Sequence, residues 1–282
     1  MKNHPFLLPV TVIMLMSLSA DALMGVTPRL SASLKVVDED SLRTIHYTYG
    51  LNLGAYFANN GTANYYNGTG RHSLEDAINR QQTYNRIRES LGYDFELHGL
   101  PENMGYTPAI LIGVFGTLQF TGSTSLHGEF NFARLKASDQ FTLTLKKPSF
   151  IEGDNVRRYP LSGTEERSEI KIGVQHTFLS ARSSTHPFVE TGFSLTNTRV
   201  RENSARIEGS TVSIRNFSDT YYDFRDDGIG MGTYASLGIR MDLGDAYALA
   251  LGAGSHFKMI KLGNNDTYFM QFTLFTRLFL SQ

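Results

Sequence analysis

Large apolar side chains alternate with small or polar ones over most of the chain beyond residue 42. In the first such segment, Tyr47 and Leu51 fall on one face and Asn52 falls on the other. A period of two is typical of a β-strand whose two faces meet different surroundings. We therefore predict eight strands, in the segments 46–56, 107–120, 125–145, 169–179, 187–199, 230–242, 247–258 and 268–280.

The segment 125–145 departs from strict alternation part-way along its length. Phe130 and Phe132 share one face before Lys136. After Lys136, Phe141 and Leu143 place the apolar pattern on the other face. One extra residue in a strand shifts the alternation in this way, so the pattern predicts a β-bulge or an irregular stretch near 137–139.

The connections between the segments alternate in length. Those near 121–124, 181–186 and 244–245 are short, whereas the first, third and fifth connections are long. The last connection, 263–266, is short but lies in phase with the long ones. Short turns at one rim and longer loops at the other are typical of a membrane barrel. The predicted fold is all-β, a closed antiparallel eight-stranded transmembrane β-barrel.

One stretch of the first long loop has a helical pattern instead. Within 73–91, Leu74, Ala77 and Ile78 begin an apolar stripe with helical spacing. Ser73 and Asp76 resemble the start of a capping box. We predict one helical insertion here, as an amphipathic helix that caps the barrel mouth; a helix that binds a partner is the alternative.

Charged residues concentrate on the face of the strands that carries small and polar side chains. Eight strands enclose an interior just wide enough for side chains, and a buried charge needs a partner of opposite sign. The residues therefore predict a structural ion-pair network in a filled lumen, with a proton or ion pathway as the alternative and no room for a diffusion porin. The predicted network consists of Glu129, Lys171, Glu190, Arg240, Asp242 and Arg277.

The opposite, apolar face is expected to meet lipid. Tyrosines near strand ends fit an aromatic girdle, in which rings lie at the level of the lipid headgroups. The predicted girdle residues are Tyr47, Tyr106, Tyr247 and Tyr268. A soluble ligand-binding barrel would turn these faces around, and the concentration of Gly, Ser, Thr and charge on one face favours that face as the lumen.

The N-terminus has the pattern of a secretory signal. An apolar run of about 13 residues follows Lys2, and Ala20 and Ala22 match a small-residue cleavage site. A membrane-spanning helix would need about 20 residues, which argues against an N-terminal anchor. We predict a signal peptide over 1–22, an N-terminal segment over 23–41 and a barrel domain over 42–282.

Composition excludes several other classes of protein. The net charge of −1 lacks the basic footprint of a nucleic-acid-binding protein. The sequence contains no cysteine, which excludes a disulfide scaffold, a thiolate nucleophile and cysteine-ligated metals.

The sequence predicts no catalytic, cofactor-binding or metal site. Ser255 and His256 are a conceivable nucleophile and base, but adjacent strand residues point to opposite faces, so we assign His256 to the lumen instead. Asp223, Asp226 and Asp227 form an acidic cluster that could hold a cation. A solvated loop or a protein-contact surface is the favoured interpretation of these acids.

Three segments carry a resemblance to a known family. The last strand is rich in phenylalanine over 269–275 and, together with the export signal and the eight alternating strands, resembles small outer-membrane barrels of the OmpA/OmpX type. The segments 105–113 and 129–133 look more like the outer-membrane β-barrel proteins of Bacteroidota, including PorT-like proteins. Such barrels often end in an aromatic residue, whereas here Phe279 is followed by three more residues. The resemblance covers about 42–282 and implies work in secretion or gliding for some members.

These observations lead to one functional hypothesis and two alternatives. We expect a non-enzymatic protein of the cell outer membrane, structural or partner-binding, linked to secretion or envelope integrity. Its partners would be outer-membrane lipid and another envelope protein bound through the loops 58–105 and 202–228. The first alternative is an outer-membrane lipid-modifying enzyme or protease, and the second is the soluble ligand-binding barrel.

Overall fold

The computed structural model describes residues 46–70, 72–148, 153–179, 184–214, 227–244, 247–263 and 267–280. These residues belong to one compact unit, Ile45–Gln282. The predicted signal peptide and N-terminal segment, 1–22 and 23–41, lie outside the described residues, as do Asp223 and Asp226. Among the described helices, none has the length and apolar character needed to cross a membrane.

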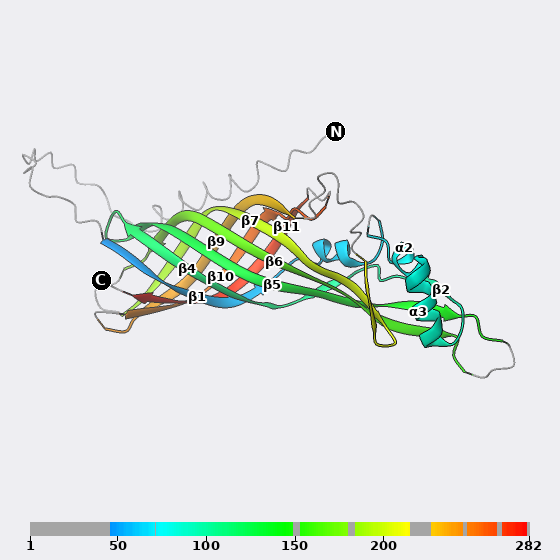
Figure 1. Cartoon of the computed structure of the whole chain (residues 1–282). Helices are drawn as coiled ribbons and strands as arrows, with labels where there is room; N and C mark the ends of the chain where they lie inside the picture. Colours follow the sequence, from blue (N-terminus) through cyan, green and yellow to red (C-terminus); the bar gives the residue numbers. More distant parts are fainter. Residues whose placement is uncertain are drawn as a thin grey trace, which may run out of the picture. The chain divides into compact units, whose positions relative to one another are not determined.

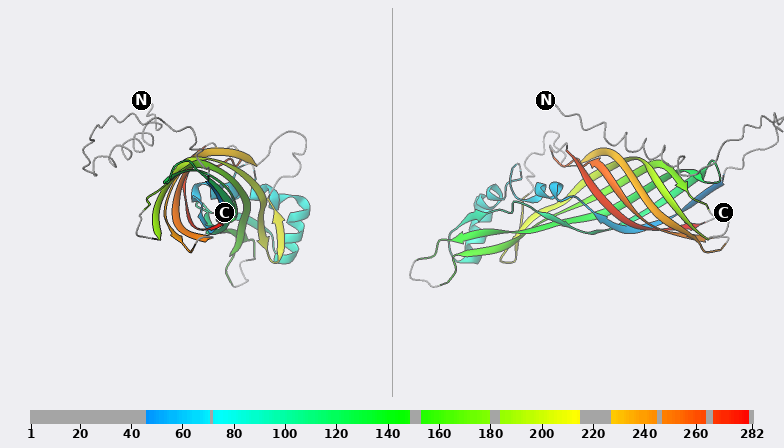
Figure 2. Two further views of the ribbon diagram at one scale, coloured as in Figure 1. Left: turned by 90° about the vertical axis from the view of Figure 1, so that its left-hand side faces the viewer. Right: turned by 180° about the vertical axis from the view of Figure 1, so that it is seen from behind.

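The fold is a single antiparallel sheet of eleven strands (Figure 1). The hydrogen-bonded order runs from β5 through β4, β1, β11, β10, β9 and β7 to β6, and β6 pairs again with β5. These strands therefore form a closed ring, which Figure 2 shows from one end. The ring strands are β1 (His46–Phe57), β4 (Ala109–Gln119), β5 (Thr124–Leu145), β6 (Val156–Thr177), β7 (Thr185–Ile207), β9 (Gly228–Asp242), β10 (Tyr247–Met259) and β11 (Tyr268–Leu280).

Around the ring, most large apolar side chains point outward and most polar ones point inward, where they share the interior with a small cluster that includes Phe115, Phe188, Phe275 and Phe279. On β4 and β11, exposed and buried residues alternate along nearly the whole strand. The exposed members are apolar and form a continuous surface that we call the apolar belt. The belt includes Tyr47, Leu51, Leu53, Ile110, Ile112, Val114, Phe130, Ile170, Ile172, Val189, Phe193, Leu195, Leu237, Ile239, Leu251, Met270, Phe272 and Leu274.

The long strands β5, β6 and β7 continue beyond the belt, and there the polarity of the two faces is reversed. On β5 the inward side chains change from the polar Glu129 and Asn131 to the apolar Leu135, Phe141 and Leu143. The pairing of β5 with β6 is continuous from 124 to 144, so the predicted bulge or irregular stretch at 137–139 is wrong. The apolar pattern changes phase because the strand leaves one environment for another, while its register stays the same.

A bulge does occur, but on β7. The register between β6 and β7 shifts between Thr164 and Glu165, opposite Glu202 and Val200. Up to Val200, the inward side chains of β7 are those of the even-numbered residues. After the extra residue, odd-numbered residues such as Asn203 and Ala205 point inward instead. This shift directs the last part of β7 toward the interior beyond the belt.

The parts beyond the belt form a small packed unit that we call the extension. Its sheet adds β2 (Phe95–Gly99), β3 (Gly105–Thr107) and β8 (Ser210–Ser213) to the ends of β5, β6 and β7. Two helices complete it, α2 (Leu74–Asn79) and α3 (Gln81–Leu91). Its core includes Leu74, Ile78, Ile87, Phe95, Phe141, Leu143, Leu145, Tyr159, Leu161, Ala205, Ile207 and Val212.

Two loop predictions are corrected by the extension. The predicted fourth strand began at 169, whereas β6 begins at Val156. The predicted loop 202–228 is in part strand, since β7 runs to Ile207 and β8 follows it. Both segments resemble loops in sequence because their outward side chains meet water and lack the apolar residues of the belt.

The helical insertion is present, divided at Arg80. The Ser73 side chain accepts a hydrogen bond from the Asp76 amide and caps α2. Gly92, in the left-handed conformation, ends α3. The helices cover the extension rather than the ring mouth: the Tyr84 ring of α3 stacks on Phe95 of β2 at 4.8 Å, and Figure 2 shows α2 and α3 to one side of the ring. The short 3₁₀ helix η1 (Asn60–Tyr66) covers the interior instead, as shown below by its contacts.

Candidate functional site: a buried ionic network

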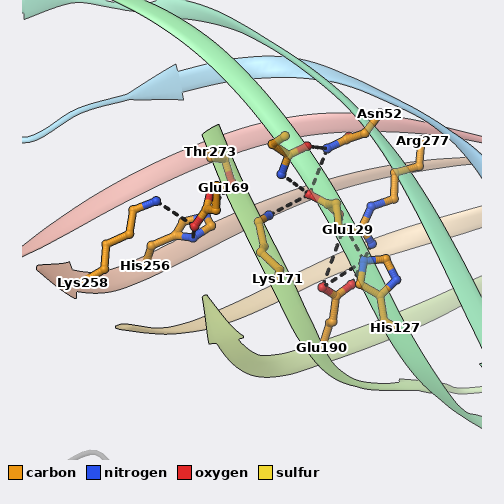
Figure 3. A network of polar contacts seen from close by, with 11 residues as sticks. Asn52, His127, Glu129, Glu169, Lys171, Glu190, His256, Lys258, Thr273 and Arg277 are labelled. Atoms are coloured by element: carbon orange, nitrogen blue, oxygen red, sulfur yellow. Dashed lines mark hydrogen bonds and ion pairs between the residues drawn. The ribbon is translucent and has the colours of Figure 1, made fainter. Parts of the chain in front are cut away.

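The interior of the ring holds a cluster of ion pairs centred on Glu129 (Figure 3). Lys171 Nζ donates to Glu129 Oε1 at 2.8 Å, and Asn52 Nδ2 donates to the same atom at 3.1 Å. Arg277 bridges two acids, because Nη2 donates to Glu129 and Nη1 donates to Glu190 Oε2 at 2.7 Å. The Arg277 side chain has no accessible surface, so side chains fill the ring at this level.

His127 lies between the two carboxylates of this cluster. Its Nε2 is 3.1 Å from Glu129 Oε2 and 3.5 Å from Glu190 Oε1. These three residues could in principle offer ligands to a metal ion. Two buried carboxylates here already face two buried cations, Lys171 and Arg277. The charge is therefore matched by protein groups, and the arrangement favours a structural network over a metal centre.

A second cluster joins Glu169, Lys258, His256 and Thr273 (Figure 3). Lys258 Nζ donates to Glu169 Oε1 at 2.7 Å, and His256 Nδ1 is 3.5 Å from the same oxygen. The other ring nitrogen, Nε2, lies 3.1 Å from Thr273 Oγ1.

The order carboxylate, imidazole, hydroxyl in this cluster is also that of a hydrolase triad. Two observations argue against that chemistry. Glu169, His256 and Thr273 are all buried, so no surface is open to a substrate. Lys258 also binds the carboxylate that would have to orient the imidazole. Ser255 pairs in register with Phe272 and, as its neighbour His256 points inward, lies on the outer face.

A third cluster closes the interior below the extension. Arg167 Nε donates to Glu165 Oε1 at 2.6 Å, and the Tyr66 and Tyr106 hydroxyls donate to Glu165 Oε2 at 2.7 and 3.0 Å. Burial and the Glu165 carboxylate raise the pKa of the Tyr66 phenol well above its ordinary value, so the phenol remains a donor. Thr62 of η1 also accepts from Arg167 Nη2. These contacts hold η1 across the ring.

The six predicted network residues separate into two groups. Glu129, Lys171, Glu190 and Arg277 lie together, as described above. Arg240 and Asp242 form their own pair, Nε to Oδ1 at 2.9 Å, with side chains 28% and 37% exposed. His186 Nε2 is 3.3 Å from Asp242 Oδ2. This pair lies at the end of β9, beside the short turn to β10, and therefore belongs to the rim.

Sequence reasoning missed several members of the network. Glu169 and Lys258 share the inward phase of Lys171 and His256, and this signal was available in the sequence. Glu165 and Arg167 lie in the first part of β6, which resembles a loop in sequence. The residues missed are Asn52, His127, Asn131, Glu165, Arg167, Glu169 and Lys258. Among the described residues, four buried carboxylates thus face four buried lysines or arginines.

Tyr106 and Asp227 have different surroundings from those predicted. Tyr106 points inward to Glu165 and does not belong to a girdle, whereas Tyr47, Tyr247 and Tyr268 are exposed on the outer face. Asp227, the described member of the acidic cluster, accepts a hydrogen bond from the Val200 amide at 2.8 Å.

The position of η1 depends on a close approach at Gly163. A Cβ atom at this residue would lie 2.1 Å from the Tyr66 ring. We expect Gly163→Ala to displace the ring from Glu165 and to destabilise the folded protein by about 1–3 kcal/mol. Gly128→Ala, on β5, is the control because its Cβ would meet nothing within 4 Å. Urea unfolding checks both variants; equal stability would show that Tyr66 packing contributes little.

Comparison with known proteins gives matches in structure alone. No family model matches the sequence, and no curated protein matches it significantly. Neisserial surface protein A is 9% identical, with a TM-score of 0.39 over 84% of this chain and 96% of its own. The outer membrane protein OprG from Pseudomonas aeruginosa is 8% identical, with a TM-score of 0.41 over 84% and 97%.

A third match is the attachment invasion locus protein Ail of Yersinia pestis. It is 6% identical, with a TM-score of 0.34 over 84% of this chain and 99% of its own. At these identities and scores, the likeness by itself establishes neither the fold nor the function of this chain.

Proposed function

We propose that this chain is an eight-stranded transmembrane β-barrel of the outer membrane. The observation that carries the proposal is the apolar belt, which surrounds a polar interior whose charges are matched. Monomeric soluble proteins rarely expose apolar patches of more than a few hundred Å². Closure of the ring by the pairing of β5 with β6 leaves no edge unpaired among the described strands of the belt, as a bilayer requires.

We also propose that the extension lies outside the cell. The turn at 121–123, the strand ends beside the other two short connections, and the first and last ring residues, His46 and Leu280, lie at the rim opposite the extension. In outer-membrane barrels the short turns face the periplasm and the longer loops face outward. Exposed tyrosines near both rims, Tyr47 and Tyr247 at one and Tyr268 at the other, fit the two headgroup levels.

The proposed role is non-enzymatic, and it belongs to the extension. The interior is filled by buried ion pairs, which disfavours a porin, and His256 has no accessible surface for an enzyme to use. A packed unit outside the membrane, including 58–105 and the start of 202–228, is suited to bind another envelope protein. The resemblance to PorT-like barrels of Bacteroidota adds a link to secretion or envelope integrity, and this stays a prediction.

The membrane proposal is tested by cell fractionation and by a gel that compares boiled with unboiled samples. We expect the protein in the outer-membrane fraction, with a mobility that changes on heating because the folded barrel resists detergent. Trypsin added to intact cells should cut at Arg86 on the exposed surface of α3. Recovery as a soluble, heat-indifferent periplasmic protein would overturn the membrane proposal. An uncut chain on intact cells that is cut after lysis would reverse the orientation.

A further inference from the structure

An open pocket of about 540 Å³ lies on the extension, where β5, β6, β7 and β8 run side by side. Three cationic side chains line it: Arg134, Lys136 and Arg206. Hydroxyl groups of Ser162 and Thr164 line the same pocket. The pocket is thus rich in hydrogen-bond donors and in positive charge.

The positive charge of this pocket is not balanced by the protein. Arg134, Lys136 and Arg206 form no side-chain ion pair with any residue in the described part of the chain. The pocket's only carboxylate among its lining residues is Glu202, which already accepts a hydrogen bond from the Ser204 hydroxyl at 2.7 Å.

Two other arginines of the same extension are paired. Arg157 binds Glu208 at 2.7 Å, and Arg201 forms an ion pair with Glu166. The pocket differs because it gathers three unpaired cations around one cavity. An anion that is not part of the protein would balance the charge of these three cations by binding in the pocket.

The pocket lies directly beyond the apolar belt. Arg134 follows the exposed Phe132 by two residues on the outer face of β5, and Lys136 follows it by four. At about 3.3 Å per residue, these cations stand roughly 7 and 13 Å farther along the strand. Thr164 of β6 pairs in register with Lys136 and lies at the same level. The headgroup region of a bilayer begins where its hydrocarbon ends, so the end of the pocket formed by Arg134 and Lys136 is at headgroup depth.

We propose that this pocket binds the phosphate-bearing headgroup of a membrane lipid. The guanidinium group of Arg134 and the ammonium of Lys136 would hold the phosphate oxygens, since guanidinium forks match phosphate geometry. Arg206 follows Ala205, which pairs with Leu161, so it lies farther from the belt than Lys136 and would bind the outer part of a larger headgroup. The hydroxyls of Ser162 and Thr164 would bind the remaining headgroup oxygens. The acyl chains would lie along the belt below Phe132. This inference rests on the proposed membrane location of the belt.

Native mass spectrometry of the purified full-length barrel in detergent tests the site with three probes. Dioleoyl phosphatidic acid carries both the phosphate and the acyl chains, dioleoylglycerol lacks the phosphate, and glycerol 3-phosphate lacks the chains. We expect phosphatidic acid to bind more tightly than either of the other two. The variant Arg134→Gln/Lys136→Gln/Arg206→Gln should weaken it about 100-fold or more, since each charge-assisted contact contributes about tenfold.

The matched control is Arg86→Gln/Lys147→Gln/Arg158→Gln, which removes the same charge from parts of the extension that do not line the pocket. It should bind phosphatidic acid as the wild type does.

Equal losses in both triple variants, or no loss in the first, would overturn the site. Equal binding of glycerol 3-phosphate and phosphatidic acid would overturn the lipid as its ligand. The heat-dependent gel shift separates the two proposals: its absence in the wild type counts against the barrel, and its presence without lipid binding counts against the pocket alone.

Discussion

Replacement of Leu51 by arginine is expected to destabilise the folded protein by about 2–4 kcal/mol, the cost of an arginine near the middle of the lipid-facing surface of a barrel. Leu51 points outward from β1, is 56% exposed, and pairs in register with Val114 and Leu278 of the neighbouring strands. In water the same change at so exposed a side chain would cost little. Urea unfolding of the protein folded into lipid vesicles measures the difference.

The matched control for this change is Val156→Arg. Val156 is also a large exposed apolar residue, at 46%, but it lies at the start of β6 in the extension. We expect a change within about 0.5 kcal/mol there, as for an ordinary surface position. If Leu51→Arg is as mild as Val156→Arg, the belt does not face lipid.

The substitution Glu129→Gln is expected to cost about 3–5 kcal/mol, because it leaves buried cations without their counter-charge. The amide keeps the volume of the side chain, so packing changes little. Lys171 and Arg277 both lose the carboxylate that they share, and Arg277 keeps only Glu190. The free energy of unfolding in urea gives the loss directly.

Two further variants separate this cause from a general effect of charge. Asp242→Asn breaks the half-exposed rim pair with Arg240 and should cost within about 1 kcal/mol. The double variant Glu129→Gln/Lys171→Gln should lose less than the sum of the two single variants, since it removes one charge of each sign. Strict additivity, or an equal cost at Asp242, would contradict a coupled network around Glu129.

The strands that lie wholly within the belt could be predicted closely from the sequence. The predicted segment 46–56 matches β1, and 247–258 and 268–280 match β10 and β11. Their two faces meet different surroundings along the whole length, so the period of two is continuous. The helical insertion was also identifiable, since the Ser73 cap and the stripe from Leu74 are local signals.

The extension could not be predicted in the same way. Its strands keep their register, but their apolar side chains point inward and their outward face meets water. The start of β6, with Arg157 and Arg158 exposed, therefore resembles a polar loop. The change of phase after Lys136 marks the end of the belt, and it is indistinguishable in sequence from a bulge.

Which residues belong to the charge network could not be predicted from the sequence for a different reason. Alternation says which face a side chain occupies, but not its depth along the ring. Arg240 and Asp242 share the inward phase of the network and yet lie at the rim. The depth of a side chain follows from the register between strands. Glu129 pairs with Lys171, and no local pattern on either strand specifies this pairing.

The most direct test of the account is the depth of β6 residues in a bilayer, measured by quenching with brominated lipids. The chain has no cysteine, so a single one can carry a fluorescent label. Ile172 and Arg158 both point outward from β6, the first within the belt and the second in the extension. The label at Ile172→Cys should be strongly quenched and the label at Arg158→Cys should not. Equal quenching at the two positions, or none at either, would contradict a belt embedded in lipid below an extension in water.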